Sequence, residues 1–413
     1  MEFIDEARSF WRKQSINFKL TLFRGTLLTL FNNLTMQYTS IYLRKLGATA
    51  QDISFLESAS SFVTMLLAIP AGLLIDRVKS IRKLYIAGGL LTLPISLLKG
   101  LSTNYQMFFA TRMWESIISR FYLPTVEIIQ ISSITNRDRV KGLITSTMLT
   151  SSLGLVAPLL AAYVITSLGG LQNVDSYRPL FFIQFAGTLL VYTVMVWKLK
   201  EPDMKRSQVD RNFFKNFTEM FREVPGLKWI LLMEFIRTFF MQMRFPLIQL
   251  YFYEIKNADA YILGLQGTVA TAVTLLLSMP MGSITDKVGR RKMAYMSQVV
   301  YAICVLMPIL TPSTHPEYLL LYNIFSSIGS SMEFGWFAFT QEYIPLEMRG
   351  RWVGISTMMT ALIGIPAPII GGIIWGINPD YLWWIAFVFY LFISIPLMLM
   401  IPERKNKDQT VNL

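Results

Sequence analysis

Long stretches without a charged side chain constrain this chain more than any other feature. Five of them lack Asp, Glu, Lys and Arg altogether: residues 143–168, 180–197, 293–312, 352–376 and 381–401. A helix of roughly 20 apolar residues crosses a hydrocarbon core of about 30 Å. A membrane β-barrel would instead alternate polar and apolar residues in segments of about 10, and that alternation is absent. The sequence therefore predicts an all-α integral membrane protein.

Apolar stretches between polar breaks give twelve predicted transmembrane helices. Their limits are 18–43, 51–75, 82–101, 105–132, 142–168, 178–198, 228–254, 260–285, 292–311, 317–343, 352–376 and 380–401. The longest break is rich in charge and separates two sets of six. We therefore expect an N-terminal six-helix bundle (1–198), a cytoplasmic linker with an amphipathic helix (199–227) and a C-terminal six-helix bundle (228–413).

The two sets of six share a repeat with a spacing of 210 residues. The stretch AIPAGLLIDRVKSIRK begins at residue 68, and SMPMGSITDKVGRRK begins at residue 278. Pro70, Gly72, Asp76 and Val78 reappear in the second stretch. Their counterparts are Pro280, Gly282, Asp286 and Val288, and the pairs Arg139–Arg349 and Ala157–Ala367 keep the same spacing. Matched anchors of this kind indicate a duplicated unit in parallel orientation and two pseudo-symmetric bundles.

Basic residues predict how the chain lies in the membrane. Most of the 38 lysines and arginines fall in the two tails and in the loops on the same side as the tails. The opposite loops hold only Arg44, Lys45, Lys99, Arg178 and Lys256. Because cytoplasmic loops are enriched in Lys and Arg, we expect both termini in the cytoplasm of a multi-pass protein of the plasma membrane. Basic residues spread over short loops between helices argue against nucleic-acid binding.

The repeated junction resembles the loop motif of the major facilitator superfamily, roughly G-x-x-x-D-R/K-x-G-R-R/K, and the resemblance covers the whole chain. The matching residues are Gly282, Asp286, Lys287, Gly289, Arg290, Arg291 and Lys292 in the second copy, and Gly72, Asp76, Arg77, Arg82 and Lys83 in the first, where Lys79 replaces the usual glycine. The resemblance implies a gate at the cytoplasmic end. Asp76 would approach the start of the eleventh helix and Asp286 that of the fifth, with Arg77, Lys287 and Arg290 beside them. The alternative is that the aspartates merely end a helix while the cations fix the topology.

The fourth predicted helix carries a second pattern of the same family. Arg112 and Pro124 lie twelve residues apart, as in R-x-x-Q-G-x-G-x-x-x-x-x-P of its drug/proton antiporters, with Glu115 in place of the glutamine. We assign Arg112 to the gating group on this resemblance. In the fifth and eleventh helices the antiporter pattern is reduced to small residues. These are Ala157, Pro158, Ala161, Ala162, Ala367, Pro368, Gly371 and Gly372, for which close helix packing is a sufficient role.

Charged side chains inside the predicted spans concentrate in every third helix. They are Arg24, Arg112, Glu115, Arg120, Glu127, Glu234, Arg237, Arg244 and Glu333 in the first, fourth, seventh and tenth helices, with Glu57 as the exception. A charge at the bilayer centre costs at least about 2.5–3.5 kcal/mol. These four helices are therefore expected to line a central aqueous cavity.

The same charges suggest roles at that cavity. Arg112–Glu115 and Glu234–Arg237 are spaced to neutralise each other along a helix. Arg120, Arg244 and Glu333 have no such neighbour. We predict Glu333, and Glu115 second, as proton-coupling residues, and Arg120 and Arg244 as substrate-binding residues; pairing of Glu333 with one of these arginines is the alternative. Further substrate-binding candidates are Asn33, Gln37, Tyr38, Gln242 and Trp336, although ordinary interhelical hydrogen bonds would also account for them.

These features predict a secondary active transporter that moves a small organic solute by alternating access. Proton-coupled efflux of an amphiphilic compound is the leading expectation, and proton-coupled uptake of an organic anion or sugar is the alternative. The single Cys304 and single His315 argue against a metal site or a cofactor, and no catalytic constellation indicates an enzyme. A passive channel would not need duplicated gating aspartates. The expected partners are the solute, protons and the lipid bilayer, and we expect a monomer.

Overall fold

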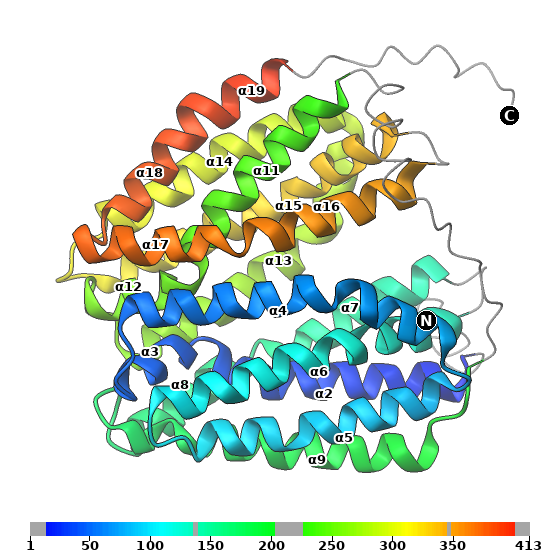
Figure 1. Cartoon of the computed structure of the whole chain (residues 1–413). Helices are drawn as coiled ribbons and strands as arrows, with labels where there is room; N and C mark the ends of the chain where they lie inside the picture. Colours follow the sequence, from blue (N-terminus) through cyan, green and yellow to red (C-terminus); the bar gives the residue numbers. More distant parts are fainter. Residues whose placement is uncertain (1–13, 135–138, 203–225, 345–347, 401–413) are drawn as a thin grey trace, which may run out of the picture.

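Helices form all the regular structure that the computed structural model describes, which covers residues 14–134, 139–202, 226–344 and 348–400 (Figure 1). For a few residues inside helices, Asp76 among them, only the backbone is described. The first half of the chain contains α2 (Ile16–Met36), α3 (Thr39–Lys45), α4 (Ala50–Arg77), α5 (Ile81–Gly100), α6 (Tyr105–Ser132), α7 (Arg139–Gly154), α8 (Ala157–Ser167), η2 (Val174–Ser176) and α9 (Arg178–Lys198). The second half contains α11 (Leu227–Arg244), η3 (Phe245–Leu247), α12 (Ile248–Glu254), α13 (Ala260–Val288), α14 (Arg290–Leu310), η4 (Pro316–Tyr318), α15 (Leu319–Tyr343), α16 (Arg349–Ile363), α17 (Pro366–Ile377), α18 (Tyr381–Phe389), the π-helical η6 (Tyr390–Ser394) and α19 (Ile395–Met400).

Each of the twelve predicted ranges is occupied by one long helix or by consecutive shorter helices. The fifth and eleventh ranges divide at equivalent places, into α7 and α8 and into α16 and α17. Pro158 and Pro366 stand in the first turn of α8 and α17, where the missing N–H of proline costs no helical hydrogen bond. The first and seventh ranges also divide, so that α3 and α12 are short segments at one end of the molecule. This end is called the α3/α12 end below.

Four of the twelve ranges are too polar to pass as membrane spans by length and hydropathy. In the part of the chain that the structure describes, eight helical segments pass that test, and α2, α6, α11 and α15 are not among them. These are the first, fourth, seventh and tenth ranges, which carry the intramembrane charges. A polar helix in a membrane is stable where it faces water or other protein groups, so these four helices belong in the interior.

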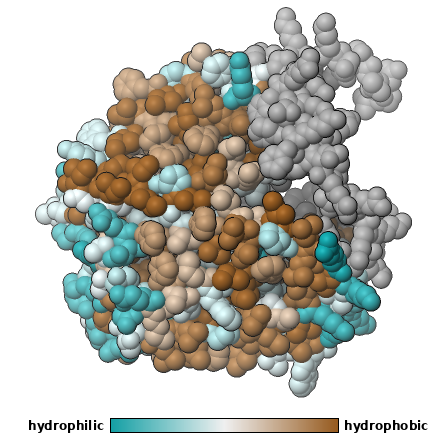
Figure 2. All heavy atoms as spheres, in the orientation of Figure 1, coloured by the Kyte–Doolittle hydropathy of each residue, from teal (hydrophilic) through white to brown (hydrophobic). Residues whose placement is uncertain are grey.

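The outer surface has the apolar character that a lipid environment requires. Large hydrophobic side chains stand exposed along it, including Leu66, Leu276 and Phe392. Figure 2 shows this apolar surface across both halves, with hydrophilic residues gathered at the α3/α12 end. The exposed hydrophobic residues continue over many helix turns, which is expected for a face covered by acyl chains and not by water.

The two halves meet along two crossings of equivalent helices, α4 with α17 and α8 with α13. Ala157, Ala161 and Ala162 on α8 are fully buried. A Cβ atom added to Gly264 of α13 would lie 2.6 Å from the carbonyl oxygen of Pro158 on α8. Backbones approach this closely only where side chains are small. The structure thus confirms the packing role expected for the small residues of the fifth and eleventh ranges.

Candidate functional site

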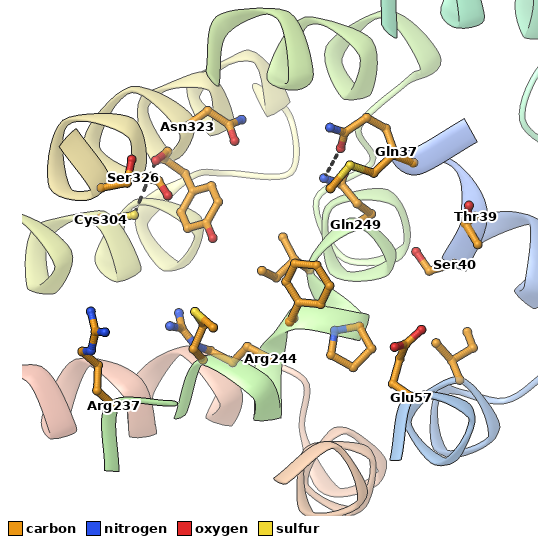
Figure 3. Close-up of a pocket in the computed structure, with 18 of the residues that line it drawn as sticks. Gln37, Thr39, Ser40, Glu57, Arg237, Arg244, Gln249, Cys304, Asn323 and Ser326 are labelled. Carbon is orange, nitrogen blue, oxygen red and sulfur yellow. Dashed lines mark hydrogen bonds between the residues drawn. The ribbon is translucent and has the colours of Figure 1, made fainter. Parts of the chain in front are cut away.

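A central cavity of about 1140 Å³ lies between the two halves. The four polar helices α2, α6, α11 and α15 contribute to its wall. They are joined by residues of α3, α4, α5, α9, α12, α14 and α16 and of the short η3 and η6. Apolar and aromatic side chains alternate there with charged and amide groups (Figure 3). The structure therefore places the expected cavity where the spacing of the charges predicted it.

Contacts between the halves close the cavity at the α3/α12 end. Arg44 Nε of α3 lies 2.7 Å from Glu254 Oε1 of α12. Gln249 Nε2 donates to Gln37 Oε1 at 2.5 Å, as Figure 3 shows. Tyr38 is buried, and its hydroxyl donates to the carbonyl oxygen of Ala260 at 2.9 Å. Tyr38 thus contributes to the closure and is not part of the cavity wall.

The wall in the first half carries a network of four charged residues. Glu115 Oε2 accepts hydrogen bonds from Lys99 Nζ at 2.7 Å and from Arg112 Nη1 at 2.8 Å. Arg112 Nη2 also lies 3.2 Å from Glu57 Oε2 of α4. Two anions and two cations therefore balance each other here. Arg112, which the sequence resemblance assigned to gating, links both carboxylates of the network.

The wall in the second half carries a network with a surplus of acid. Arg237 of α11 forms ion pairs with Glu234 of the same helix, at 3.2 Å, and with Glu333 of α15. Glu333 also accepts a hydrogen bond from the hydroxyl of Tyr301 at 3.0 Å, and Glu234 accepts one from Trp336 Nε1 at 3.0 Å. Glu333, which has no partner along its own helix, thus finds one in Arg237. Two carboxylates share one guanidinium group.

Arg244, two turns further along α11, is a cation without a carboxylate. Arg244 is only 7% exposed, and its Nε donates to the carbonyl oxygen of Phe240 at 3.1 Å. The guanidinium carbon lies 5.4 Å from the ring centre of Trp383. Among the described residues, Nη1 of Arg244 has no hydrogen-bond partner and no acidic group forms a salt bridge with this side chain.

A second chamber of about 430 Å³ lies between α4, α6, α11 and α16, beside Glu57 and Arg112. Arg120 and Gln242 line this chamber and not the central cavity. Most of its other lining residues carry hydroxyl groups: Ser60, Ser61, Thr64, Ser116, Ser119, Ser356, Thr357 and Thr360. The two arginines predicted to bind substrate, Arg120 and Arg244, therefore occupy different spaces.

The remaining candidates lie away from the cavity. Asn33 of α2 donates to the carbonyl oxygen of Gly154 at 3.3 Å, which joins α2 to the end of α7. Arg77 and Lys287 are exposed at the ends of α4 and α13. The side chain of Asp286 is 72% exposed and lies 3.9 Å from Arg290. The side chain of Asp76 lies outside the described residues, so of the two aspartates predicted to act in gating only Asp286 can be placed.

Lys99 and Tyr301 are two functional candidates that sequence reasoning missed. Lys99 was placed with the loop cations, but it stands in the last turn of α5 and bonds Glu115. Nothing in the sequence marks Tyr301, because tyrosine is common in apolar helices. Only the structure shows that its hydroxyl bonds Glu333. Glu57, the one intramembrane charge that lies outside the four polar helices, pairs with Arg112.

Comparisons with known proteins agree with this architecture. A curated relative, "Multidrug resistance protein 2" of Bacillus subtilis (strain 168), is 22% identical over 425 residues and covers 97% of this chain and 100% of the relative. The nucleoside transporter NupG superposes with a TM-score of 0.74 at 12% identity, covering 94% of this chain and 100% of its own. A POT family transporter in complex with a thioalcohol-conjugated peptide gives a TM-score of 0.73 at 11% identity, over 93% of this chain and 95% of its own.

The family comparison covers nearly the whole chain in two overlapping parts. The model of the Major Facilitator Superfamily matches residues 22–257 and again residues 230–412. The all-helical fold, the cavity between its halves and the distant drug-resistance relative point the same way. This chain belongs to the Major Facilitator Superfamily and is a membrane-embedded secondary transporter, not an enzyme.

Proposed function

We propose that this protein is a proton-coupled exporter of amphiphilic organic molecules that works by alternating access. The α3/α12 end is the extracellular end in this proposal, both termini are cytoplasmic, and the protein acts as a monomer in the plasma membrane. With Arg44 bonded to Glu254, the cavity is closed toward the outside and would load from the cytoplasm. The B. subtilis relative supports the efflux direction by its name.

The shared arginine carries the proposal. Arg237 pairs with both Glu234 and Glu333, so this network has one negative charge more than it can neutralise. A surplus charge in a half-buried wall is costly, and either a proton or a cationic group of the substrate would relieve it. Because both compete for the same two carboxylates, loading of one releases the other. This competition is the physical basis of exchange between a proton and a drug.

The two predicted proton-coupling residues differ in how far neighbouring cations neutralise their negative charge. Glu115 already has two cations within hydrogen-bond distance, Lys99 and Arg112, so it has little need of a proton. Glu333 shares its cation with another acid and has a neutral partner, Tyr301. We therefore keep Glu333 as the first proton carrier and give Glu115 a structural part in its network.

Gating is proposed to involve the repeated junction. In the outward-facing state Asp286 would approach the N-terminus of α7 and Asp76 that of α16, where helix dipoles favour an anion. Arg77, Lys287 and Arg290 would flank these contacts. The high exposure of Asp286 in the present conformation supports a contact that is released when the cavity opens to the cytoplasm.

Proton-coupled uptake of an organic anion or sugar is the second candidate. Arg244 favours it, because its buried guanidinium group forms no salt bridge with a carboxylate among the described residues and a buried cation attracts an anionic ligand. Arg120 and Gln242 in the second chamber, and Gln37 and Trp336 in the central cavity, remain candidates for contacts with polar parts of either kind of substrate.

Transport into inside-out proteoliposomes tests the proposal. The probe is the ethyl ester of rhodamine B, an amphiphilic dye with a fixed positive charge. We expect an imposed inside-acid pH gradient to drive accumulation of the dye. Glu333→Gln, which imitates the protonated carboxyl group, should abolish this accumulation and weaken dye binding. The matched control is Glu127→Gln, which removes the same charge from an exposed position on α6. Full activity of Glu333→Gln, or flux that only dissipates a dye gradient, would overturn the proposal.

A further inference from the structure

We propose that Arg244 forms a subsite for an acidic group, so that the preferred substrates are zwitterionic amphiphiles. This inference rests on the proposed function of the central cavity and names the substrate class. The acidic group would be a carboxylate or a similar oxyanion, and the opposite end of the same molecule would carry a cation.

Burial and bonding set Arg244 apart from the other cations of the cavity. Lys99, Arg112 and Arg237 each have a carboxylate within 3.2 Å in the described structure. Arg244 is more than nine-tenths buried, and its Nη1 has no partner among the described residues. Removing a charge from water is costly unless a counter-charge replaces the lost hydration. Among the described residues no carboxylate neutralises this guanidinium group, so its charge is available to an anionic ligand.

The surroundings of Arg244 supply surfaces for the rest of a ligand. Its guanidinium lies over the Trp383 ring, which fixes the group in place without neutralising it. Asn323 is 8% exposed with an unpartnered Nδ2, and Gln249 has an unpartnered Oε1. Both side chains line the same cavity, and Figure 3 shows them on the side where Gln37 also lies. Unsatisfied polar atoms buried beside a cavity mark positions where a ligand that displaces the covering side chains gains hydrogen bonds.

Spacing along α11 predicts where the two charges of the ligand would lie. Arg237 and Arg244 are seven residues apart, or roughly 10 Å along a helix axis and on nearly the same face. The surplus carboxylate lies at Arg237, where Glu234 and Glu333 meet, and the unpaired cation lies at Arg244. Four glutamates and four cations line the described cavity, so the wall is neutral in sum but polarised along α11. A zwitterion of matching length would satisfy both ends.

Rhodamine B and its ethyl ester provide a matched pair of probes for this subsite. They share the cationic ring system and differ only in whether the carboxylate is free. Binding to the purified protein is measured by fluorescence polarisation at pH 7. We expect the free acid to bind about tenfold or more tightly than the ester, which is the size of a hydrogen bond to a charged group. The inference would be overturned if the acid bound less than about twofold more tightly than the ester, or if neither dye bound.

Variants separate a direct contact from a structural role. Arg244→Gln should weaken binding of the acid at least about tenfold and change binding of the ester by less than about twofold. Arg244→Lys should recover part of the preference, because it restores the charge without the planar fork. Lys83→Gln, a loss of one exposed cation at the start of α5, is the control and should leave the preference intact. An equal loss for both dyes in Arg244→Gln would show a packing role and contradict the subsite.

The same probes distinguish this inference from the proposed function. If the pH gradient drives accumulation of the ester but the acid has no binding advantage, the exporter stands and the subsite fails. If the acid binds preferentially through Arg244 but no gradient drives either dye, the subsite stands and proton coupling fails.

Discussion

Arg44 and Glu254 pair across the two halves at 2.7 Å although 210 residues separate them in the chain. The same spacing relates Asp76 to Asp286 and Ala157 to Ala367, so Arg44 and Glu254 are equivalent positions of the repeated unit. Equivalent residues can touch only near the axis that relates their units. The ion pair therefore lies close to the pseudo-twofold axis, where a single contact can hold the α3/α12 end closed.

Loss of this ion pair should open the α3/α12 end more often. The two side chains are 38% and 23% exposed, and pairs of such exposure contribute about 0.2–1 kcal/mol. Glu254→Gln should therefore raise the population open at this end by up to about fivefold. The measurement is the rate at which an impermeant thiol reagent, added on the proposed extracellular side, labels Ser40→Cys in a Cys304→Ser background.

Two further variants show whether the effect is specific. Exchanging the charges, with Arg44→Glu and Glu254→Arg together, should restore the slow rate. Arg178→Gln breaks a comparable pair with Asp175 inside the first half, so it should leave the rate unchanged. If the Glu254→Gln variant is labelled at the parental rate, the ion pair does not help to hold the α3/α12 end closed.

Gly264 should tolerate no side chain at the crossing of α8 and α13. A Cβ atom there would lie 2.6 Å from a backbone oxygen, which cannot move aside as a flexible side chain can. Overpacking of this kind costs about 1–3 kcal/mol, so Gly264→Ala should lower the melting temperature and the transport rate together. Gly72→Ala is the control, since nothing lies within 4 Å of the added Cβ and alanine favours helix. Equal melting temperatures for the two variants would contradict this account of the crossing.

The sequence predicted most of the architecture because the bilayer imposes simple rules. Apolar stretches between polar breaks located the helices, and the 210-residue spacing indicated the equivalence of the halves. The rule that charges avoid lipid identified α2, α6, α11 and α15 as interior helices before their contacts were known. The division of α7 from α8 was not predicted, because the Pro158 that begins α8 also suits an uninterrupted apolar run.

Pairings within one helix were predictable, and pairings between helices were not. Arg112–Glu115 and Glu234–Arg237 follow from a spacing of three residues and are present at 2.8 and 3.2 Å. Glu333 pairs with Arg237 on a different helix, and Glu115 has Lys99 on α5 as a second partner. Such pairs depend on the rotation and depth of each helix, which packing sets and a single sequence does not reveal.

Removal of Arg237 should destabilise the protein, and a second substitution should partly reverse this. Arg237→Gln leaves Glu234 and Glu333 in a half-buried wall without their common cation, at a cost of about 2 kcal/mol. In the double variant Arg237→Gln with Glu333→Gln only one carboxylate remains charged, so part of that stability should return. Thermal melts of the four members of this cycle, at one pH, give the coupling between the two residues. If the stability changes of the two single variants add up to that of the double variant, Arg237 and Glu333 are not coupled, and this account of the shared arginine is wrong.

Asp286→Asn should slow transport without weakening binding. In the present conformation Asp286 is largely exposed and lies 3.9 Å from Arg290, so its charge contributes little to this state. In the proposed outward-facing state it would approach the N-terminus of α7, an interaction of about 0.3–2 kcal/mol. The variant should therefore bind rhodamine B ethyl ester as the parent does but transport it about two- to thirtyfold more slowly. Asp175→Asn, at a carboxylate that is 71% exposed near the opposite end, is the control and should change neither quantity. Unchanged transport by Asp286→Asn would leave the aspartate with no more than a helix-ending role.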